Sequence, residues 1–188
     1  GITKIHTSAD GGENWTFDLH EVSGELWSIT GNASEFAAVT KEGILRGSET
    51  DIEELEYELA DEPMGSLILQ DERLVIGDLS GLATLSDEGW SYNRDDFVDY
   101  DIIALGMIPS CPGLLFAGTQ CEMGGYMSTD WGRTWTLMDT YFHYVMAFED
   151  RPSVPGEIWI VSDKRVYKSV SYGRDWTSMV PEAQQYHF

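Results

Sequence analysis

The octet STDWGRTW, residues 128–135, recurs in two further places of the chain and decides how the rest of the sequence is interpreted. SADGGENW occupies residues 8–15, and SVSYGRDW occupies residues 169–176. We number the three octets in chain order. Their first serines are Ser8, Ser128 and Ser169, so the second and third octets are 41 residues apart and the first and second are 120 apart, close to three times 41. This spacing indicates an internal repeat, which has to be settled before any local motif is interpreted.

Degenerate copies stand where a period of about 40 residues places them. Ser48 lies in GSETD and Ser86 lies in TLSDEGWSY, so that successive first serines are separated by 40, 38, 42 and 41 residues. Each unit contains short runs of apolar, β-branched and aromatic residues separated by Gly, Pro, Asp and Asn. In residues 101–138 the runs DIIALGMI, LLFAGT, YMST and TWTLM predict four strands.

Four-stranded units at this period predict an all-β chain folded as a β-propeller of about five repeat units, with the octets as hairpins at one edge. The expected units of this single domain are residues 1–20, 21–62, 63–99, 100–140 and 141–188. The first unit supplies only a third and a fourth strand and is therefore a half-blade. The acidic segment 51–62 has a helix-like composition, but its alignment with the other units predicts strand.

The two ends of the chain do not complement one another. After the last predicted strand, DWTSM, only VPEAQQYHF remains, which is too short for the two strands that the half-blade lacks. We therefore expect that these residues do not close a ring by themselves. Either they are part of a longer propeller, or the open side is covered by another chain in an oligomer or a larger complex.

Each residue type of the octet suits a tight turn. A carboxylate two residues after the serine can accept backbone N–H groups, as Asp does in Asx-turns, and the glycine can adopt a positive φ. The indole then opens the next strand, where it can cover the edge between neighbouring blades. A calcium loop is the alternative, but Asp10 and Asp130 lack the clustered oxygen ligands that Ca²⁺ requires. We therefore predict a structural hairpin with no metal ion.

The pattern Ser-x-Asp-x-Gly-x-x-Trp resembles the Asp-box, or BNR repeat, of sialidases, sortilin-type receptors, xyloglucanases and photosystem II assembly factors. The residues that match it are Ser8, Asp10, Gly12 and Trp15; Ser128, Asp130, Gly132 and Trp135; and Ser169, Gly173 and Trp176. In the third octet Ser171 replaces the acid, and the copies in the second and third units have lost part of the pattern. SETDIEEL in the second unit, for example, lacks both the glycine and the tryptophan. The resemblance implies a structural hairpin of a β-propeller. It implies no function, because the family includes enzymes and non-enzymes.

Acidic residues dominate the composition. The chain has 188 residues, with 33 Asp and Glu against 11 Lys and Arg, and a net charge of −22. This charge disfavours nucleic-acid and anionic-lipid partners, and no apolar run reaches the roughly 18 residues of a membrane span. Scattered acids are typical of proteins from high-salt organisms; an acidic protein of a low-salt organism is the alternative. Cys111 and Cys121 lie about 20 Å apart in the predicted strands, so we expect two free thiols.

No catalytic constellation emerges from the sequence. A sialidase would need an arginine cluster, a Tyr/Glu pair and an Asp on inner strands. Arg133 and Arg174 lie in octets, and the other five arginines lie away from the centre of any predicted first strand. The four histidines have no metal-ligand spacing, and HExxH, GxSxG and phosphate-loop motifs are absent. We predict a non-catalytic recognition or assembly module without a cofactor; a sialidase-like glycoside hydrolase is the alternative.

One aromatic stretch is a candidate binding patch. Tyr141, Phe142, His143 and Tyr144 precede the predicted first strand of the fifth unit and carry few charges, which suits stacking on a sugar or packing against a protein. Ordinary packing between blades is the alternative. We expect a protein or glycan partner in a surface or virion complex of a high-salt organism, with an extracellular, cell-surface or virion location favoured over the cytoplasm. Asn32 begins the triplet NAS, which matches the glycosylation sequon, but so short a motif is weak evidence for a glycosylation site.

Overall fold

The computed structural model describes residues 2–8, 10–23, 25–31, 35–41, 43–48, 51–56, 63–68, 73–97, 101–120, 124–140, 142–162 and 165–179. Within these residues the secondary structure is strand, apart from one 3-10 turn, η1 (Asp95–Phe97), and no α-helix is present. No helix in this part of the chain is therefore long and apolar enough to cross a membrane. The expectation of an all-β chain is confirmed. Asn32 and Cys121 lie outside the described residues.

The strands form one two-stranded and four four-stranded antiparallel sheets. The first pair is β1 (Ile2–Thr7) and β2 (Thr16–Ser23). The next two sheets contain β3 (Leu26–Gly31), β4 (Phe36–Thr40), β5 (Ile44–Gly47) and β6 (Ile52–Leu55), then β7 (Pro63–Ile68), β8 (Leu74–Asp78), β9 (Gly81–Ser86) and β10 (Gly89–Asn93). The last two contain β11 (Ile102–Met107), β12 (Leu115–Thr119), β13 (Gly125–Ser128) and β14 (Thr136–Leu137), then β15 (Val145–Asp150), β16 (Ile158–Ser162), β17 (Val166–Ser169) and β18 (Thr177–Ser178).

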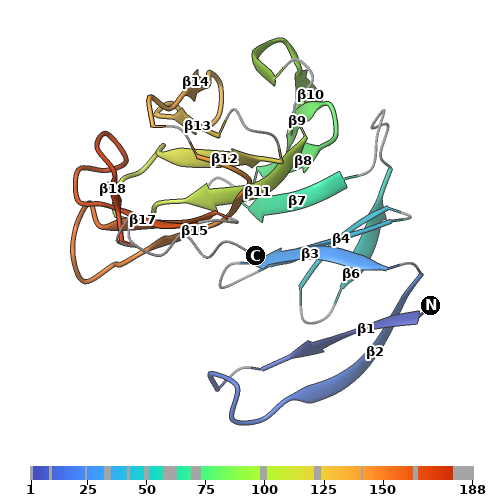
Figure 1. Cartoon of the computed structure of the whole chain (residues 1–188). Helices are drawn as coiled ribbons and strands as arrows, with labels where there is room; N and C mark the ends of the chain where they lie inside the picture. The colour runs from blue at the N-terminus through green and yellow to red at the C-terminus, as the bar shows by residue number, and fades with distance from the viewer. Residues whose placement is uncertain are drawn as a thin grey trace, which may run out of the picture.

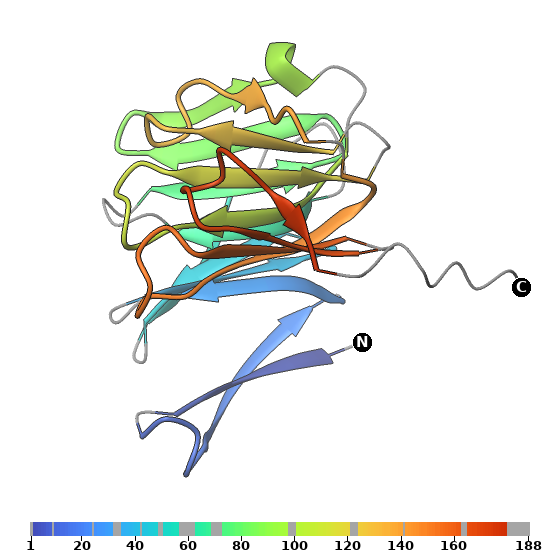
Figure 2. The same cartoon turned by 60° about the vertical axis from the view of Figure 1, so that its left-hand side comes forward.

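The sheets are arranged as a fan, with the β1–β2 hairpin at one end and the β15–β18 sheet at the other (Figure 1). Strands pair in chain order within each four-stranded sheet, and the first strands β3, β7, β11 and β15 lie side by side. Seen from another side, successive sheets stack on one another (Figure 2). Antiparallel four-stranded sheets stacked in this way form the architecture of a β-propeller. The predicted four-stranded units are confirmed for these four sheets, whereas the division into five repeat units stays a prediction.

The second strands of the two middle sheets, β8 and β12, are buried on both faces because a sheet covers each side. All five residues of β8 and of β12 are buried. Leu115 and Ala117 of β12 belong to one apolar cluster with Val75 of β8. Phe116, which lies between them in sequence, stacks on Phe148 of β15 with 5.3 Å between the ring centroids. The alternation of side chains along one strand thus joins three consecutive sheets.

Glycine allows the inner parts of two sheets to approach closely. A Cβ atom on Gly118 of β12 would lie 2.7 Å from the carbonyl oxygen of Val145 and 2.8 Å from its Cβ. A Cβ atom on Gly77 of β8 would lie 2.6 Å from a side-chain methyl of Ile102. These distances are shorter than van der Waals contact, so an alanine at either position would force two sheets apart.

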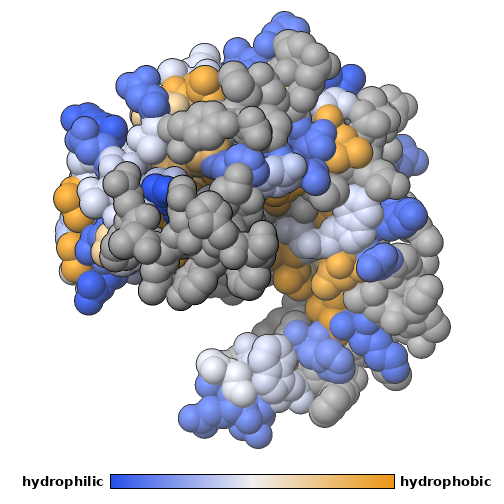
Figure 3. All heavy atoms as spheres, viewed as in Figure 1, coloured by the Kyte–Doolittle hydropathy of each residue, from blue (hydrophilic) through white to orange (hydrophobic). Residues whose placement is uncertain are grey.

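The β1–β2 hairpin contacts the rest of the molecule through the β3–β6 sheet. Ile5 and Ala38 are 6% and 0% exposed and form a small apolar cluster. Further along that sheet, Ile29 of β3 is 54% exposed, because the hairpin does not reach over the innermost strand. The hairpin projects from the fan, and the surface is hollowed beside it (Figure 3). One side of this fan is therefore left open.

The acidic segment after β5 forms a strand, as predicted for residues 51–62. β6 spans Ile52–Leu55, at the start of that segment. The N–H of Ser48 donates to the carbonyl of Asp51 at 2.7 Å, which closes a tight turn before the strand. Residues 57–60 lie outside the described residues.

Candidate functional site

The second octet forms a closed network of hydrogen bonds between β13 and β14. The Ser128 hydroxyl donates to Oδ1 of Asp130 at 2.8 Å and accepts the N–H of Gly132 at 2.8 Å. Asp130 also accepts the backbone N–H of Thr134 at 2.9 Å and its hydroxyl at 2.7 Å. The indole N–H of Trp135 donates to the Gly132 carbonyl at 3.0 Å. The serine, the carboxylate and the indole are therefore occupied within the turn.

The first and third octets repeat this network with one difference. The glycine N–H donates to the serine hydroxyl at 2.8 Å in the first octet and at 2.9 Å in the third. In the first octet, the N–H of Asn14 donates to Oδ1 of Asp10 at 2.9 Å. In the third, the hydroxyl of Ser171 accepts the corresponding N–H, that of Asp175, at 2.9 Å. A neutral hydroxyl thus satisfies the backbone position that a carboxylate satisfies in the other octets.

Hydrogen bonding keeps both octet carboxylates ionised. The backbone N–H and side-chain amide of Asn14, followed by the Ser8 hydroxyl, lower the pKa of Asp10 from 3.8 to about 2. Partial burial acts in the opposite direction on Asp130, but hydrogen bonds from Thr134 outweigh it, and the pKa of Asp130 also lies below 3.8. A carboxyl group with so low a pKa is a poor general acid near neutral pH.

Each of the last two octets is tied to the turn between the first and second strands of its own sheet. The N–H of Trp131 donates to the Gly113 carbonyl at 3.1 Å, and the N–H of Tyr172 donates to the Gly156 carbonyl at 3.2 Å. Trp131 and Tyr172 have φ values of 64° and 57°, which bulky residues rarely adopt. A Cβ atom on Gly113 would lie 3.2 Å from the Trp131 indole, so the glycine is needed for this contact.

The three octet tryptophans differ in burial. Trp135 is 7% exposed and lies edge-on against Phe97, with 5.8 Å between ring centroids. Trp176 lies edge-on against Phe116 of the preceding sheet at 6.3 Å. Trp15 is 54% exposed. The two later indoles therefore cover the joint between their own sheet and the residues before it, whereas no four-stranded sheet precedes Trp15 in the described chain.

The predicted aromatic patch lies only partly at the surface. Phe142 is 0% exposed and meets Trp176 edge-on at 5.5 Å within a core cluster. Phe142 therefore follows the alternative of ordinary packing between blades, because its ring fills the core between two sheets. His143 and Tyr144 do reach the surface, with 4.7 Å between their ring centroids and Tyr144 37% exposed. Tyr141 lies outside the described residues.

Among the described residues no sheet packs against one face of the β15–β18 sheet, and we call it the open face. By strand register it includes Ala147, Glu149, Trp159, Val161, Val166 and Lys168. Ala147 and Glu149 are exposed, Val161 is 40% exposed, and Trp159 and Lys168 are half-buried. The opposite face packs on the β11–β14 sheet, as the burial of alternate residues along β16 shows. The open face thus carries apolar side chains at the free end of the fan.

The corresponding residues of the preceding sheets are buried. In the strand register, Trp159 corresponds to Phe116 of β12 and Val75 of β8, which are 0% and 1% exposed. Val161 corresponds to Gly118, which is buried against β15. The open face therefore stands where each of those sheets receives its next neighbour.

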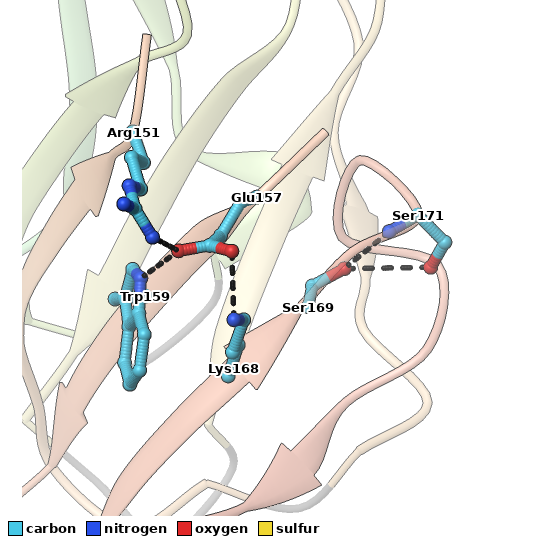
Figure 4. A network of polar contacts seen from close by, with 6 residues as sticks. All are labelled: Arg151, Glu157, Trp159, Lys168, Ser169 and Ser171. Atoms are coloured by element: carbon cyan, nitrogen blue, oxygen red, sulfur yellow. Dashed lines mark hydrogen bonds and ion pairs between the residues drawn. The ribbon is translucent and has the colours of Figure 1, made fainter. Parts of the chain in front are cut away.

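A polar network occupies one end of the open face (Figure 4). The Lys168 ammonium lies 2.7 Å from Oε2 of Glu157 and 5.0 Å from the centre of the Trp159 ring. The Trp159 indole N–H and the Arg151 guanidinium reach Oε1 of Glu157 at 3.1 Å and 3.4 Å. Hydrogen bonding from Lys168, opposed by burial, lowers the pKa of Glu157 below 4.5. The carboxylate, which is 5% exposed, therefore stays ionised, and Lys168 and Arg151 balance its negative charge beside the aromatic ring.

Metal ligands and reactive groups are scarce in the described residues. They contain no group of three or more His, Cys, Asp or Glu side chains placed to hold a metal ion, and Cys111 carries a free thiol. The arginines gather more than the sequence indicated, because Arg46, Arg73 and Arg133 line one hollow. Sequence reasoning missed this set because its members come from three different sheets.

Comparisons with known proteins bear on the fold. No family model matches the chain, and no curated protein matches it by sequence. An ancestral GH74 enzyme is similar over 85% of this chain, with a TM-score of 0.73 and 13% identity. YCF48 bound to a D1 peptide is similar over 89%, with a TM-score of 0.70 and 15% identity. A virginiamycin B lyase from Staphylococcus aureus, with quinupristin, is similar over 98%, with a TM-score of 0.67 and 11% identity.

The chain spans only part of each of these proteins: 24%, 58% and 61% of their respective lengths. They are β-propeller proteins, and the likeness supports a propeller fold for this chain. At such low identities the likeness is one of fold alone. Because the group includes both enzymes and a peptide-bound protein, the function has to be argued from the chain's own residues.

Proposed function

We propose that this chain is a non-catalytic β-propeller module that binds a protein partner through the open face of the β15–β18 sheet. The observation that carries the proposal is the exposure of Val161, 40%, at a position that is buried in the preceding sheets. Covering such a side chain removes apolar surface from water, which stabilises a complex. An apolar centre beside the charged rim of Glu157, Lys168 and Arg151 has the anatomy of a protein interface.

The residue types around the open face support this use. Trp, Tyr, Met and Arg are enriched at protein interfaces. Trp159 and Arg151 lie in the polar network, and Tyr144 and Met146, at the start of β15, are 37% and 59% exposed. The surviving part of the aromatic patch, His143 and Tyr144, therefore adjoins the innermost strand of the same sheet.

A protein is a better-supported partner than a glycan. Among the similar structures, YCF48 is bound to a peptide, so a propeller of related fold binds a polypeptide. The covering partner in this proposal is another chain, in an oligomer or a larger complex. Glycan binding rests only on exposed aromatic rings.

We further assign the octets to the Asp-box repeat and the chain to five repeat units, of which the β1–β2 hairpin is the incomplete first. The shared hydrogen bonds of the three turns support this assignment. The net charge of −22 supports a high-salt habitat, because dense carboxylates stay hydrated there and salt screens their repulsion. A cell-surface, extracellular or virion complex is the proposed setting.

The test is co-purification of the tagged chain from cells of its source organism, with a matched pair of variants. Val161→Asp places a charge on the open face. Val154→Asp places the same charge on the β15–β16 turn, where Val154 is 37% exposed. We expect one polypeptide to accompany the wild type and the Val154 variant and to be lost from the Val161 variant. An unchanged set of companions with Val161→Asp would refute the proposal.

A sialidase-like glycoside hydrolase is the competing class. A panel of fluorogenic glycosides, assayed in molar salt, separates the two, and we expect no turnover. Turnover that disappears when an acid of an inner strand is replaced, as in Glu149→Gln on β15, would instead establish catalysis.

A further inference from the structure

A hollow of about 690 Å³ lies at the outer edge of the β7–β10 sheet, away from the open face. Three arginines line it: Arg46 from β5, Arg73 from the residue before β8, and Arg133 from the second octet. The β9–β10 hairpin forms another wall with Thr84, Ser86, Asp87, Glu88 and Ser91. The chain has seven arginines among 33 acidic residues, so the gathering of three around one hollow is unusual for its composition.

Protein contacts hold two of these guanidinium groups. Arg73 donates from a terminal nitrogen to the carbonyl oxygen of Trp131 at 3.3 Å, which directs it toward the second octet. Arg133 follows Trp131 by two residues, in the same turn, and its side chain is exposed. Arg46 donates through Nε to Glu35 at 2.7 Å, and both side chains are largely buried. Glu35 thus balances the charge of Arg46, and Arg73 and Arg133 are the arginines of the hollow that lie at the second octet, opposite the lining carboxylates Asp87 and Glu88.

We propose that this hollow binds a small oxyanion, carried by a carboxylate or a phosphate group, between Arg73 and Arg133. The planar guanidinium fork matches the oxygen geometry of both groups and can bind them in a bidentate manner. A volume of about 690 Å³ falls within the usual range for small-molecule sites. The hollow lies on other sheets than the open face, so this proposal stands independently of partner binding.

The net charge of −22 does not exclude an anion from the hollow. In about 0.1 M salt, exposed charges more than about 10 Å apart are largely screened from each other. The charges within that distance decide binding, and at the second octet the hollow is lined by two arginines, Arg73 and Arg133. Binding should therefore be measurable at moderate ionic strength and weaken as salt is raised.

The chain contains its own control for Arg133. Arg174 occupies the same position of the third octet and is also exposed, but it is not among the residues that line the hollow. Arg133→Ala and Arg174→Ala remove the same charge from equivalent turns. Any effect of net charge or of the turn itself is shared by both variants, whereas loss of the anion site affects only the first.

Isothermal titration calorimetry with citrate and with pyrophosphate tests the proposal on the full chain. Ionic strength is kept constant with NaCl, because added salt alone changes the screening of the carboxylates. We expect saturable binding of at least one probe, about tenfold weaker in Arg133→Ala, as expected for loss of charged hydrogen bonds, and unchanged in Arg174→Ala. The probe that binds more tightly identifies the group as carboxylate or phosphate.

Three results would overturn the proposal. They are the absence of saturable heat for both probes up to about 20 mM, equal affinity of the wild type and Arg133→Ala, and equal weakening by Arg174→Ala. Circular dichroism of both variants shows whether the fold is kept. Arg133→Lys, which keeps the charge but lacks the planar fork, should recover only part of the affinity.

Discussion

Replacing Asp130 with alanine tests the role of the octet carboxylate. The change removes the acceptor of four hydrogen bonds, donated by the Ser128 hydroxyl, the backbone N–H groups of Arg133 and Thr134, and the Thr134 hydroxyl. Because Arg133 and Thr134 are exposed, water replaces part of each interaction. With a net contribution near 0.5 kcal/mol per bond, the loss is about 2 kcal/mol. That corresponds to a fall in Tm of about 4–8 °C for a domain of this size.

Thermal unfolding followed by circular dichroism measures this fall, with two comparison variants. Asp130→Ser copies the third octet, in which the Ser171 hydroxyl accepts one N–H at 2.9 Å and lies 3.4 Å from the Ser169 hydroxyl. Two of the four interactions are then restored, so this variant should recover about half of the loss. Asp139→Ala removes an exposed carboxylate just beyond β14 and controls for the change in net charge. A Tm for Asp130→Ala equal to that of Asp139→Ala would show that the carboxylate does not stabilise the turn, and the reasoning would fail.

Three further results are expected. Stability should rise from about 0.1 to about 2 M NaCl, because salt screens the repulsion among the acids; a flat or falling Tm would remove the high-salt inference. In an NMR pH titration, the chemical shift of the Asn14 amide proton should change with a midpoint near pH 2, because the pKa of Asp10 in the folded state is about 2. The stability that this carboxylate adds above pH 3.8 is lost as the pH falls through 2. A midpoint near 3.8 would contradict the hydrogen bonding. Gly118→Ala should destabilise the fold by about 2–3 kcal/mol, because its Cβ would lie 2.7 Å from the Val145 carbonyl oxygen. Gly43→Ala is the control and should cost less, because the atom nearest to its Cβ, 3.1 Å away, is the end of a flexible side chain. Equal chemical-denaturation midpoints for the two variants would contradict this.

The parts of the fold that could be predicted from sequence depend on local contacts. The hydrogen bonds of the octet join residues two to four apart, such as Ser128 to Asp130 and to Gly132, so that the pattern itself specifies the turn. The strands of each sheet are neighbours in the chain, and short apolar runs were enough to place them. The repeat spacing therefore predicted the architecture, although the bounds of β6 depended on a turn that the sequence did not make evident.

The burial of single residues depends on distant partners and could not be predicted in the same way. The sequence left open whether Phe142 contacts a partner or packs between blades, and its ring packs against Trp176, which is 34 positions later in the chain. Arg46, Arg73 and Arg133 converge only because three sheets stack. Such contacts require the relative placement of sheets, which repeat spacing alone does not supply.

The open face could not be found from the sequence of its strand. In β12, the run from Leu115 to Thr119 is buried on both faces, because the strand lies between two sheets. In β16, Trp159 and Val161 alternate with two isoleucines, so this strand is apolar on both faces as well. Such a run predicts cover on both faces, whereas only one face of the β15–β18 sheet is covered in the described residues.

Site-specific photo-crosslinking tests the central claim, that the open face of the β15–β18 sheet is a binding surface. A benzoylphenylalanine residue replaces Val161 in one protein and Val154 in the other, two positions of similar exposure, 40% and 37%. Irradiation in cells of the source organism should join the Val161 probe to one polypeptide of defined mass and leave the Val154 probe without that adduct. No adduct at Val161, or the same adduct from both positions, would contradict the claim.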